Sequence, residues 1–168
     1  MSTTVLPYEE LEQEALRQIQ QNHVGVLATT EGNYVTARTI MLIYDGLKIS
    51  FLTPTWTRKF KQISANKNVA LAVNNIQIEG VASIKGRTSD AENAWFLKAF
   101  EELSPELYKL YRDPCKEPNT IYRVIEITPT RIALFYGPPV IHLDVLNVNE
   151  KTAIRYYITL GKALSPHY

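Results

Sequence analysis

The sequence predicts an α+β fold in which a mostly antiparallel sheet closes, wholly or in part, into a barrel. Short β-rich segments follow one another between residues 24 and 85, helical segments come next, and two or three further strands complete the chain. Closure into a barrel removes most of the exposed edges that so many short strands present. A chain of 168 residues suits one domain with a buried core, so we expect a single domain over residues 1–168.

The first half of the chain is expected to form one covering helix and then the strands. Residues 7–22 place Leu11, Ala15, Leu16 and Ile19 on one helical face. Alternating and β-branched residues bounded by Gly and Asn turns predict strands at residues 24–29, 34–44, 47–53, 68–74 and 76–85. Only residues 55–66 interrupt these strands with helical spacing.

The second half is expected to begin with two helices. Ser89 and Glu92 form a capping box for a helix over residues 89–103, and Ser104 precedes Pro105 at the start of a shorter one. A loop at residues 113–119 separates these helices from the last strands. Those strands are expected at residues 121–128, 131–136 and 140–146.

Composition restricts the function. The balance of 18 Lys+Arg against 17 Asp+Glu creates no overall field, so an anion site must be local and a nucleic-acid-binding barrel is disfavoured. The single cysteine, Cys115, fits a reducing compartment, and we expect a cytoplasmic protein. His23, His142 and His167 lack ligand spacing, so no metal site is expected. No apolar run approaches the ~20 residues of a membrane span.

The segment TWTRKFKQI at residues 55–63 carries three basic residues, Arg58, Lys59 and Lys61, in the first turn of the predicted helix. A helix N-terminus already carries about half a positive charge from its unsatisfied N–H groups, so cations there are unfavourable unless an anion binds between them. The segment therefore predicts an anion site. The alternative interpretation is a solvated basic face without a ligand.

A predicted hairpin brings an arginine to the same place. Asp45 and Gly46 between two apolar strands favour a two-residue type I′ turn, in which Tyr44 faces Leu47. Counting back along the strands pairs Arg38 with Thr53 at the open end of the hairpin, just before the basic helix.

Together these groups describe a site for a phosphate monoester: guanidinium, ammonium, hydroxyl and free N–H donors. The alternative role for Arg38 is a structural salt bridge to a carboxylate such as Glu31 or Glu79.

These segments resemble the pyridoxamine 5′-phosphate oxidase-like, FMN-binding split-barrel family over roughly residues 5–140. The resemblance rests on the order and spacing of TARTIML, FLT, the T-x-R-K helix start, NKNVAL and the G-x-A of EGVAS. It implies a six-stranded split β-barrel with flanking helices, and a homodimer with FMN at the subunit interface. Carried over by position, Arg38, Arg58 and Lys59 hold the FMN phosphate, and Thr53 donates a hydroxyl group.

The resemblance also implies contacts to the rest of the cofactor. Thr39 and Ile40 lie along the isoalloxazine ring, and Leu52 lines the ribityl side. A side-chain amide from the partner subunit commonly completes such sites, and both Asn75 and Gln77 fit this role. The alternative for Asn75 is an ordinary turn residue.

The chain departs from true pyridoxamine phosphate oxidases near its C-terminus, where residues 150–168 lack their Arg-x-His substrate motif. We therefore expect an FMN-dependent oxidoreductase that passes hydride or electrons from NADH, NADPH or a small organic donor to an acceptor, with the chemistry in the flavin and no identified catalytic side chain. The alternative is a non-catalytic flavin or haem protein for binding, sensing or storage. His23 and His142 are haem-ligand or proton-donor candidates, but they also fit simple packing roles.

Overall fold

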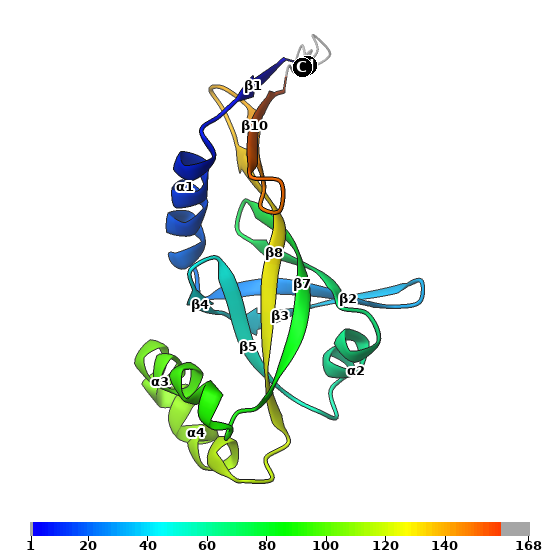
Figure 1. The fold of residues 1–168 in the computed structure, drawn as a ribbon, viewed down its shortest axis with the longest axis vertical. Coiled ribbons are helices and arrows are strands. Elements are labelled where there is room, and N and C mark those ends of the chain that lie inside the picture. The colour runs from blue at the N-terminus through cyan, green and yellow to red at the C-terminus, as the bar shows by residue number, and fades with distance from the viewer. Residues whose placement is uncertain (1, 159–168) are drawn as a thin grey trace, which may run out of the picture.

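The computed structural model describes residues 2–158, which form one twisted, ten-stranded sheet flanked by helices (Figure 1). The strands are β1 (Thr3–Val5), β2 (Val24–Glu31), β3 (Tyr34–Met41), β4 (Ile43–Asp45), β5 (Lys48–Pro54), β6 (Asn68–Val73), β7 (Ile76–Arg87), β8 (Tyr122–Tyr136), β9 (His142–Asn147) and β10 (Thr152–Tyr157). The helices are α1 (Tyr8–Gln20), α2 (Arg58–Ala65), α3 (Ala94–Leu103) and α4 (Pro105–Lys116), with a short 3-10 turn at Ala91–Asn93. The strand pairs are antiparallel, which confirms the predicted α+β class.

The sheet has ten strands, more than the six predicted for the barrel, and it is not closed. Its order is β1-β10-β9-β8-β7-β6-β2-β3, and β5 pairs with both β4 and β8. The 15-residue strand β8 connects the barrel to the rest of the sheet. Its first half pairs with β5 and its second half pairs with β9, and β7 pairs along most of its other edge. Strands β9, β10 and β1 extend beyond the barrel as an arm (Figure 1). This arm accounts for three of the additional strands.

The predicted strand over residues 34–44 bends at Leu42 and becomes two strands. Its first part, β3, pairs with β2, and its second part, β4, pairs with β5. The Leu42 side chain is fully buried, and its N–H donates to the carbonyl of His23 at 2.9 Å. Because β3 and β5 are not paired, the predicted neighbours Arg38 and Thr53 are not cross-strand partners.

The hairpin register also differs from the prediction by two residues. Tyr44 faces Ile49, and Asp45 faces Lys48, so the two loop residues are Gly46 and Leu47. Gly46 has a φ of 58°, which is the conformation that a type II′ turn requires at its first central position. The expected type I′ turn at Asp45 and Gly46 was therefore wrong.

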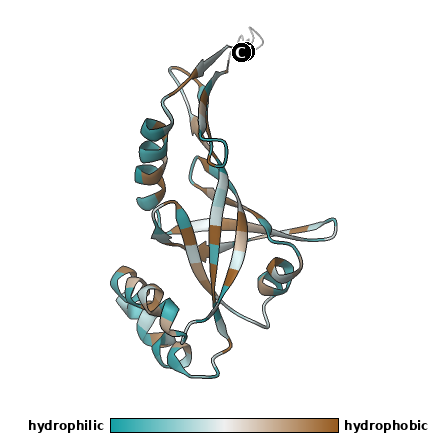
Figure 2. Ribbon diagram, in the orientation of Figure 1, coloured by the Kyte–Doolittle hydropathy of each residue, from teal (hydrophilic) through white to brown (hydrophobic). Residues whose placement is uncertain are grey.

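Two apolar clusters hold these elements together. The larger one fills the barrel with side chains such as Leu27, Phe51 and Ile78, and α1 covers it with the predicted face of Leu11, Ala15 and Ile19. Apolar residues accordingly line the central strands and one side of α1 (Figure 2).

The second cluster joins α3 and α4 to the barrel through Phe96, Phe100 and Tyr108, which pack with Ile43 and Val124. These two helices therefore form a separate layer beside β4, β5 and β8.

Two local predictions for this helical layer need correction. The capping box at Ser89 does not form, because α3 begins at Ala94 after a 3-10 turn and its N-cap is Asn93. The expected loop at residues 113–119 is helical as far as Lys116, with Pro114 inside α4. A proline near the end of a helix removes a hydrogen bond that the fraying last turn can lose at little cost. No helix within residues 2–158 is long and apolar enough to cross a membrane.

Candidate functional site

The end of β5 is tied to the start of α2 by two side-chain hydrogen bonds of Thr57. Thr57 is the N-cap of α2, and its hydroxyl accepts from the N–H of Phe60 at 3.4 Å and donates to the carbonyl of Pro54 at 2.8 Å. The buried Thr53 hydroxyl lies 2.8 Å from that of Thr57. This arrangement places Thr53 beside the first turn of α2, where the N–H groups of residues 58 and 59 have no backbone partner in the described chain.

Arg38 reaches the same helix from β3 by a different route from the predicted one. Its Nη1 donates to the hydroxyl of Thr29 at 2.7 Å and to the carbonyl of Leu27 at 3.1 Å. Its Nη2 donates to the hydroxyl of Thr36 and, at 3.3 Å, to Oε1 of Gln62 in α2. Thus Arg38 and Thr53 are both anchored to α2, although they are not neighbours in the sheet.

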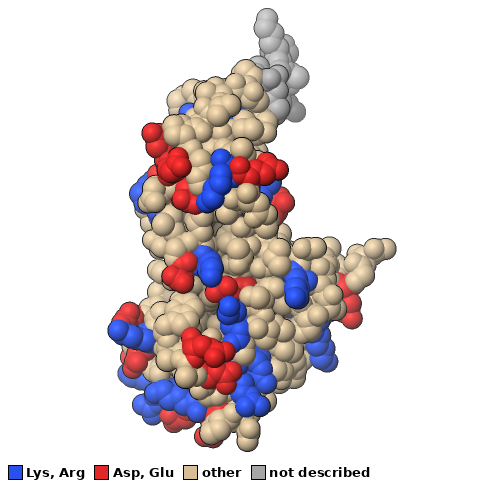
Figure 3. All heavy atoms as spheres, in the orientation of Figure 1, with Lys and Arg blue, Asp and Glu red and all other residues tan. Residues whose placement is uncertain are grey.

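Arg38, Arg58 and Lys59 form a group of cations without a carboxylate partner. Among residues 2–158, no Asp or Glu oxygen lies within 4.0 Å of their charged nitrogens. The Arg58 guanidinium instead lies 4.8 Å from the centre of the Tyr34 ring. Lys and Arg side chains are visible over α2 in Figure 3. The alternative interpretation of Arg38 as a structural salt bridge is therefore not supported.

These cations also act on one another. Burial, followed by the charge of Arg58, lowers the pKa of Arg38. Burial, followed by the charge of Arg38, lowers the pKa of Lys59. Both shifts show that the cationic forms are held in an unfavourable environment, which a bound anion would relieve.

A cavity of about 170 Å³ is lined by Lys59 of α2 together with residues of β3 and β5. Thr39, Ile40 and Leu52 line it, so four of the predicted site residues share one cavity. The remaining lining includes Met41 and Phe51 of the strands and Phe100, Leu107 and Tyr111 of α3 and α4. The contribution of α3 and α4 was missed from the sequence, because nothing local in those helices indicates which strands they face.

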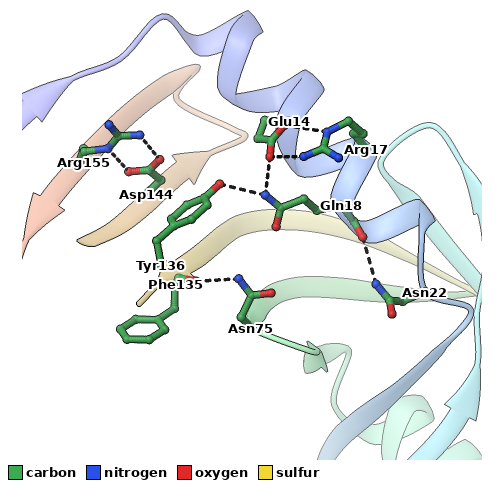
Figure 4. A network of polar contacts seen from close by, with 9 residues as sticks. All are labelled: Glu14, Arg17, Gln18, Asn22, Asn75, Phe135, Tyr136, Asp144 and Arg155. Carbon is green, nitrogen blue, oxygen red and sulfur yellow. Dashed lines mark hydrogen bonds and ion pairs between the residues drawn. The ribbon is translucent and has the colours of Figure 1, made fainter. Parts of the chain in front are cut away.

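The two amide candidates occupy different positions. Asn75 lies in the β6–β7 turn, and its Nδ2 donates to the carbonyl of Phe135 at 2.6 Å (Figure 4). This contact fits the alternative interpretation of a turn residue. Gln77 is exposed on β7 and makes no side-chain hydrogen bond with the described residues.

Gln77 lies on the same sheet face as Thr39. Thr39 faces Val26, Val26 faces Ala72, and Ala72 faces Gln77 across three successive strand pairs. Three strand spacings separate Thr39 from Gln77 by about 14 Å, which is too far for both side chains to touch one end of the same ring system within one chain.

The two described histidines show packing contacts. His142 stacks on Tyr136 with ring centres 4.5 Å apart, and its Nδ1 lies 2.9 Å from the carbonyl oxygen of Val140. His23 is exposed and lies against Tyr44. No group of three or more potential metal ligands occurs among residues 2–158. His167 lies outside the described residues.

A model of the pyridoxamine 5′-phosphate oxidase family matches residues 11–136, and no curated protein matches the chain. Among solved structures, a pyridoxamine 5′-phosphate oxidase-related, FMN-binding protein from Nostoc punctiforme is similar at 17% identity, with a TM-score of 0.60 and coverage of 94% of this chain and 99% of that one.

General stress protein 26 from Bacillus anthracis is 24% identical, with a TM-score of 0.54 and coverage of 73% and 92% of this chain and that one. A haem storage protein from Vibrio cholerae is 14% identical, with a TM-score of 0.56 and coverage of 71% and 89%. At these identities the solved structures show the fold alone.

Proposed function

Because the chain belongs to the pyridoxamine 5′-phosphate oxidase family, we propose that it binds FMN at the start of α2 and acts as an FMN-dependent oxidoreductase. The observation that carries this proposal is the cation group of Arg38, Arg58 and Lys59, which has no carboxylate partner in the described chain and whose Lys59 lines the 170 Å³ cavity. A phosphate supplies the missing negative charge. The adjoining cavity is lined by apolar side chains suited to a flavin ring.

The residues of the chain have separate tasks in this proposal. Arg38, Arg58 and Lys59 bind the phosphate with Thr53 and the free N–H groups of α2. The backbone of Thr39 and Ile40 faces the ring edge, and Leu52 excludes water from the ribityl side. FMN, once bound, accepts and returns hydride or single electrons. Because that chemistry belongs to the flavin, the protein needs no catalytic acid, base or nucleophile.

We propose that the active species is a homodimer joined through the exposed face of β2, β3, β6 and β7. This face carries solvent-exposed apolar residues in the described monomer, and Val24, Val26, Val35 and Val81 are 58%, 44%, 62% and 40% exposed. Exposed apolar residues on one sheet face are typical of protein–protein interaction sites. In a two-fold dimer this face meets itself, so Gln77 of one subunit approaches the cofactor of the other. Gln77 is therefore our choice over Asn75 as the completing amide.

The electron donor in this proposal is NADH, NADPH or a small organic molecule. Vitamin B6 oxidation is not proposed, because residues 150–168 lack the Arg-x-His motif; residues 159–168 lie outside the described part of the chain. The single cysteine, Cys115, is buried and free, so we place the activity in the reducing cytoplasm. The second candidate function is flavin or haem storage, which the fold shared with a haem storage protein favours.

One spectroscopic experiment tests both candidates. Purified protein is titrated with FMN and, separately, with haem, and each complex is followed by its absorption spectrum. We expect FMN to bind, its absorption band to bleach with NADH or NADPH without oxygen, and the band to return in air. An FMN complex that no donor reduces would favour storage or sensing. Binding of haem without FMN would overturn the proposal.

A further inference from the structure

Gln62 is buried completely beneath the cation group, although glutamine side chains are usually exposed. Its Oε1 accepts hydrogen bonds from the hydroxyls of Thr29 at 2.6 Å and Thr36 at 2.8 Å, and from Nη2 of Arg38 at 3.3 Å. Its Nε2 has no partner among the described residues, although it is buried. An unpaired buried donor costs free energy, so this side chain calls for an explanation.

The hydrogen bonds between Arg38 and Gln62 all run from the guanidinium toward the amide oxygen. Arg38 donates hydrogen bonds to the hydroxyls of Thr29 and Thr36, and each of these hydroxyls in turn donates a hydrogen bond to Oε1 of Gln62. Oε1 of Gln62 is therefore the terminal acceptor of the whole network, and turning the amide over would set its N–H group against Nη2 of Arg38, which can only donate. The network fixes both the position and the orientation of the Arg38 guanidinium.

Every acceptor that holds Arg38 is electrically neutral: two hydroxyls, the carbonyl of Leu27 and the amide of Gln62. A glutamate at position 62 could accept the same three hydrogen bonds without leaving an unpaired N–H group. However, its carboxylate would form a buried ion pair with Arg38 and cancel the charge that the phosphate needs. The uncharged amide therefore favours ligand binding over stability of the empty protein.

We propose that Gln62 is a positioning residue that fixes Arg38 for phosphate binding while leaving its positive charge uncompensated. This inference rests on the proposed function, because it assigns Arg38 to the FMN phosphate. It predicts that a negative charge at position 62 lowers FMN affinity without lowering stability. A purely structural role would move both in the same direction.

The test is Gln62→Glu, with FMN and riboflavin as ligands. Riboflavin has the same ring and ribityl chain as FMN but no phosphate. We expect the substitution to weaken FMN binding about tenfold or more, which corresponds to the loss of one charge-assisted hydrogen bond. Riboflavin affinity should stay the same. The urea midpoint of the ligand-free protein should be equal to that of the wild type or higher, because Arg38 gains a partner and the unpaired amide is removed.

Two matched variants separate position from charge. Ser64→Glu adds the same charge to an exposed site on the same helix and should leave FMN affinity almost unchanged. Gln62→Met keeps the length of the side chain but removes the acceptor, so it should weaken FMN binding, leave riboflavin binding unchanged and lower the urea midpoint. If Gln62→Glu does not fold, Gln62→Met decides the question: equal losses for FMN and riboflavin would overturn the inference.

The outcomes distinguish this inference from the function on which it rests. Failure of the wild type to bind FMN would overturn the proposed function. Wild-type FMN binding with unchanged affinity in Gln62→Glu would overturn only the role of Gln62. The same conclusion would follow if Gln62→Glu lost FMN affinity and stability together, or if Ser64→Glu had an equal effect on FMN.

Discussion

The hydroxyl oxygens of Thr53 and Thr57 lie 2.8 Å apart, at the point where β5 ends and α2 begins. Either hydroxyl can be the donor in this pair, and the Thr57 hydroxyl also contacts the carbonyl of Pro54. The contact holds the strand end against the helix N-cap and sets the Thr53 hydroxyl next to the free N–H groups of the first turn. The candidate phosphate site is built on this junction.

We expect Thr57→Ala to lower the free energy of unfolding by about 1 kcal/mol, the usual cost of removing an N-cap side chain. FMN affinity should also fall, because the first turn of α2 loses its fixed position. Urea unfolding and titration with FMN measure the two effects. Thr57→Ser keeps the cap and should resemble the wild type; if it were as unstable as Thr57→Ala, the methyl group rather than the cap would be responsible.

Replacement of Arg58 tests the anion site directly. Arg58→Ala should weaken FMN binding by about 1.5 to 3 kcal/mol, as expected for the loss of a hydrogen bond between charged groups. The unfolding free energy should change little, because Arg58 is exposed and has no ion pair within residues 2–158. Isothermal titration measures the affinity. Lys61→Ala is the control on the same helix, and an equal loss there would show that only the general charge of α2 matters.

We expect FMN affinity to fall at alkaline pH, because Lys59 loses its positive charge there. Burial and then the charge of Arg38 lower its folded-state pKa below the ordinary 10.5. Between the two values the unfolded chain binds more protons than the folded one, so the contribution of Lys59 to ligand-free stability rises with pH across this window. FMN binding has the opposite trend, because the phosphate requires the ammonium form, and its affinity should fall as the pH rises through the lowered pKa.

The variant Lys59→Arg checks this assignment, since arginine keeps its charge throughout the range. The phosphate is already fully ionised above about pH 7, so in FMN titrations from there to pH 10.5 a difference between the two proteins reports on residue 59. We expect the decline in affinity to be smaller in Lys59→Arg than in the wild type. Identical declines in the two proteins would remove Lys59 from the phosphate site.

The proposed dimer can be broken at the centre of its sheet face. Val26→Lys places a charge between Thr39 and Ala72, where two copies of the face would meet. We expect the wild type to sediment as a dimer and Val26→Lys as a species near 19.1 kDa with weaker FMN binding. Val5→Lys, at an 81% exposed position on β1, should leave both properties unchanged. A monomeric wild type that binds FMN normally would contradict the shared site.

The parts of the site that are close in sequence could be predicted from the sequence. Thr53, Arg58 and Lys59 lie within seven residues of one another, and a strand end, a proline and an N-cap already determine their proximity. The covering face of α1 could be predicted for the same reason, since helical spacing alone sets it. Such features depend on backbone geometry over one or two turns, which local residues decide.

The position of Arg38 was decided by the tertiary structure. The predicted and observed hairpin registers differ by two residues, and side chains alternate with a period of two, so both registers leave the same residues facing the core. The hydrophobic pattern cannot distinguish them. The bend at Leu42 depends on a contact with His23, 19 residues away, and the network on Gln62 joins residues that are 24 or more positions from it. Sequence alone therefore predicted the local cationic turn, whereas long-range packing determined how Arg38 reaches it.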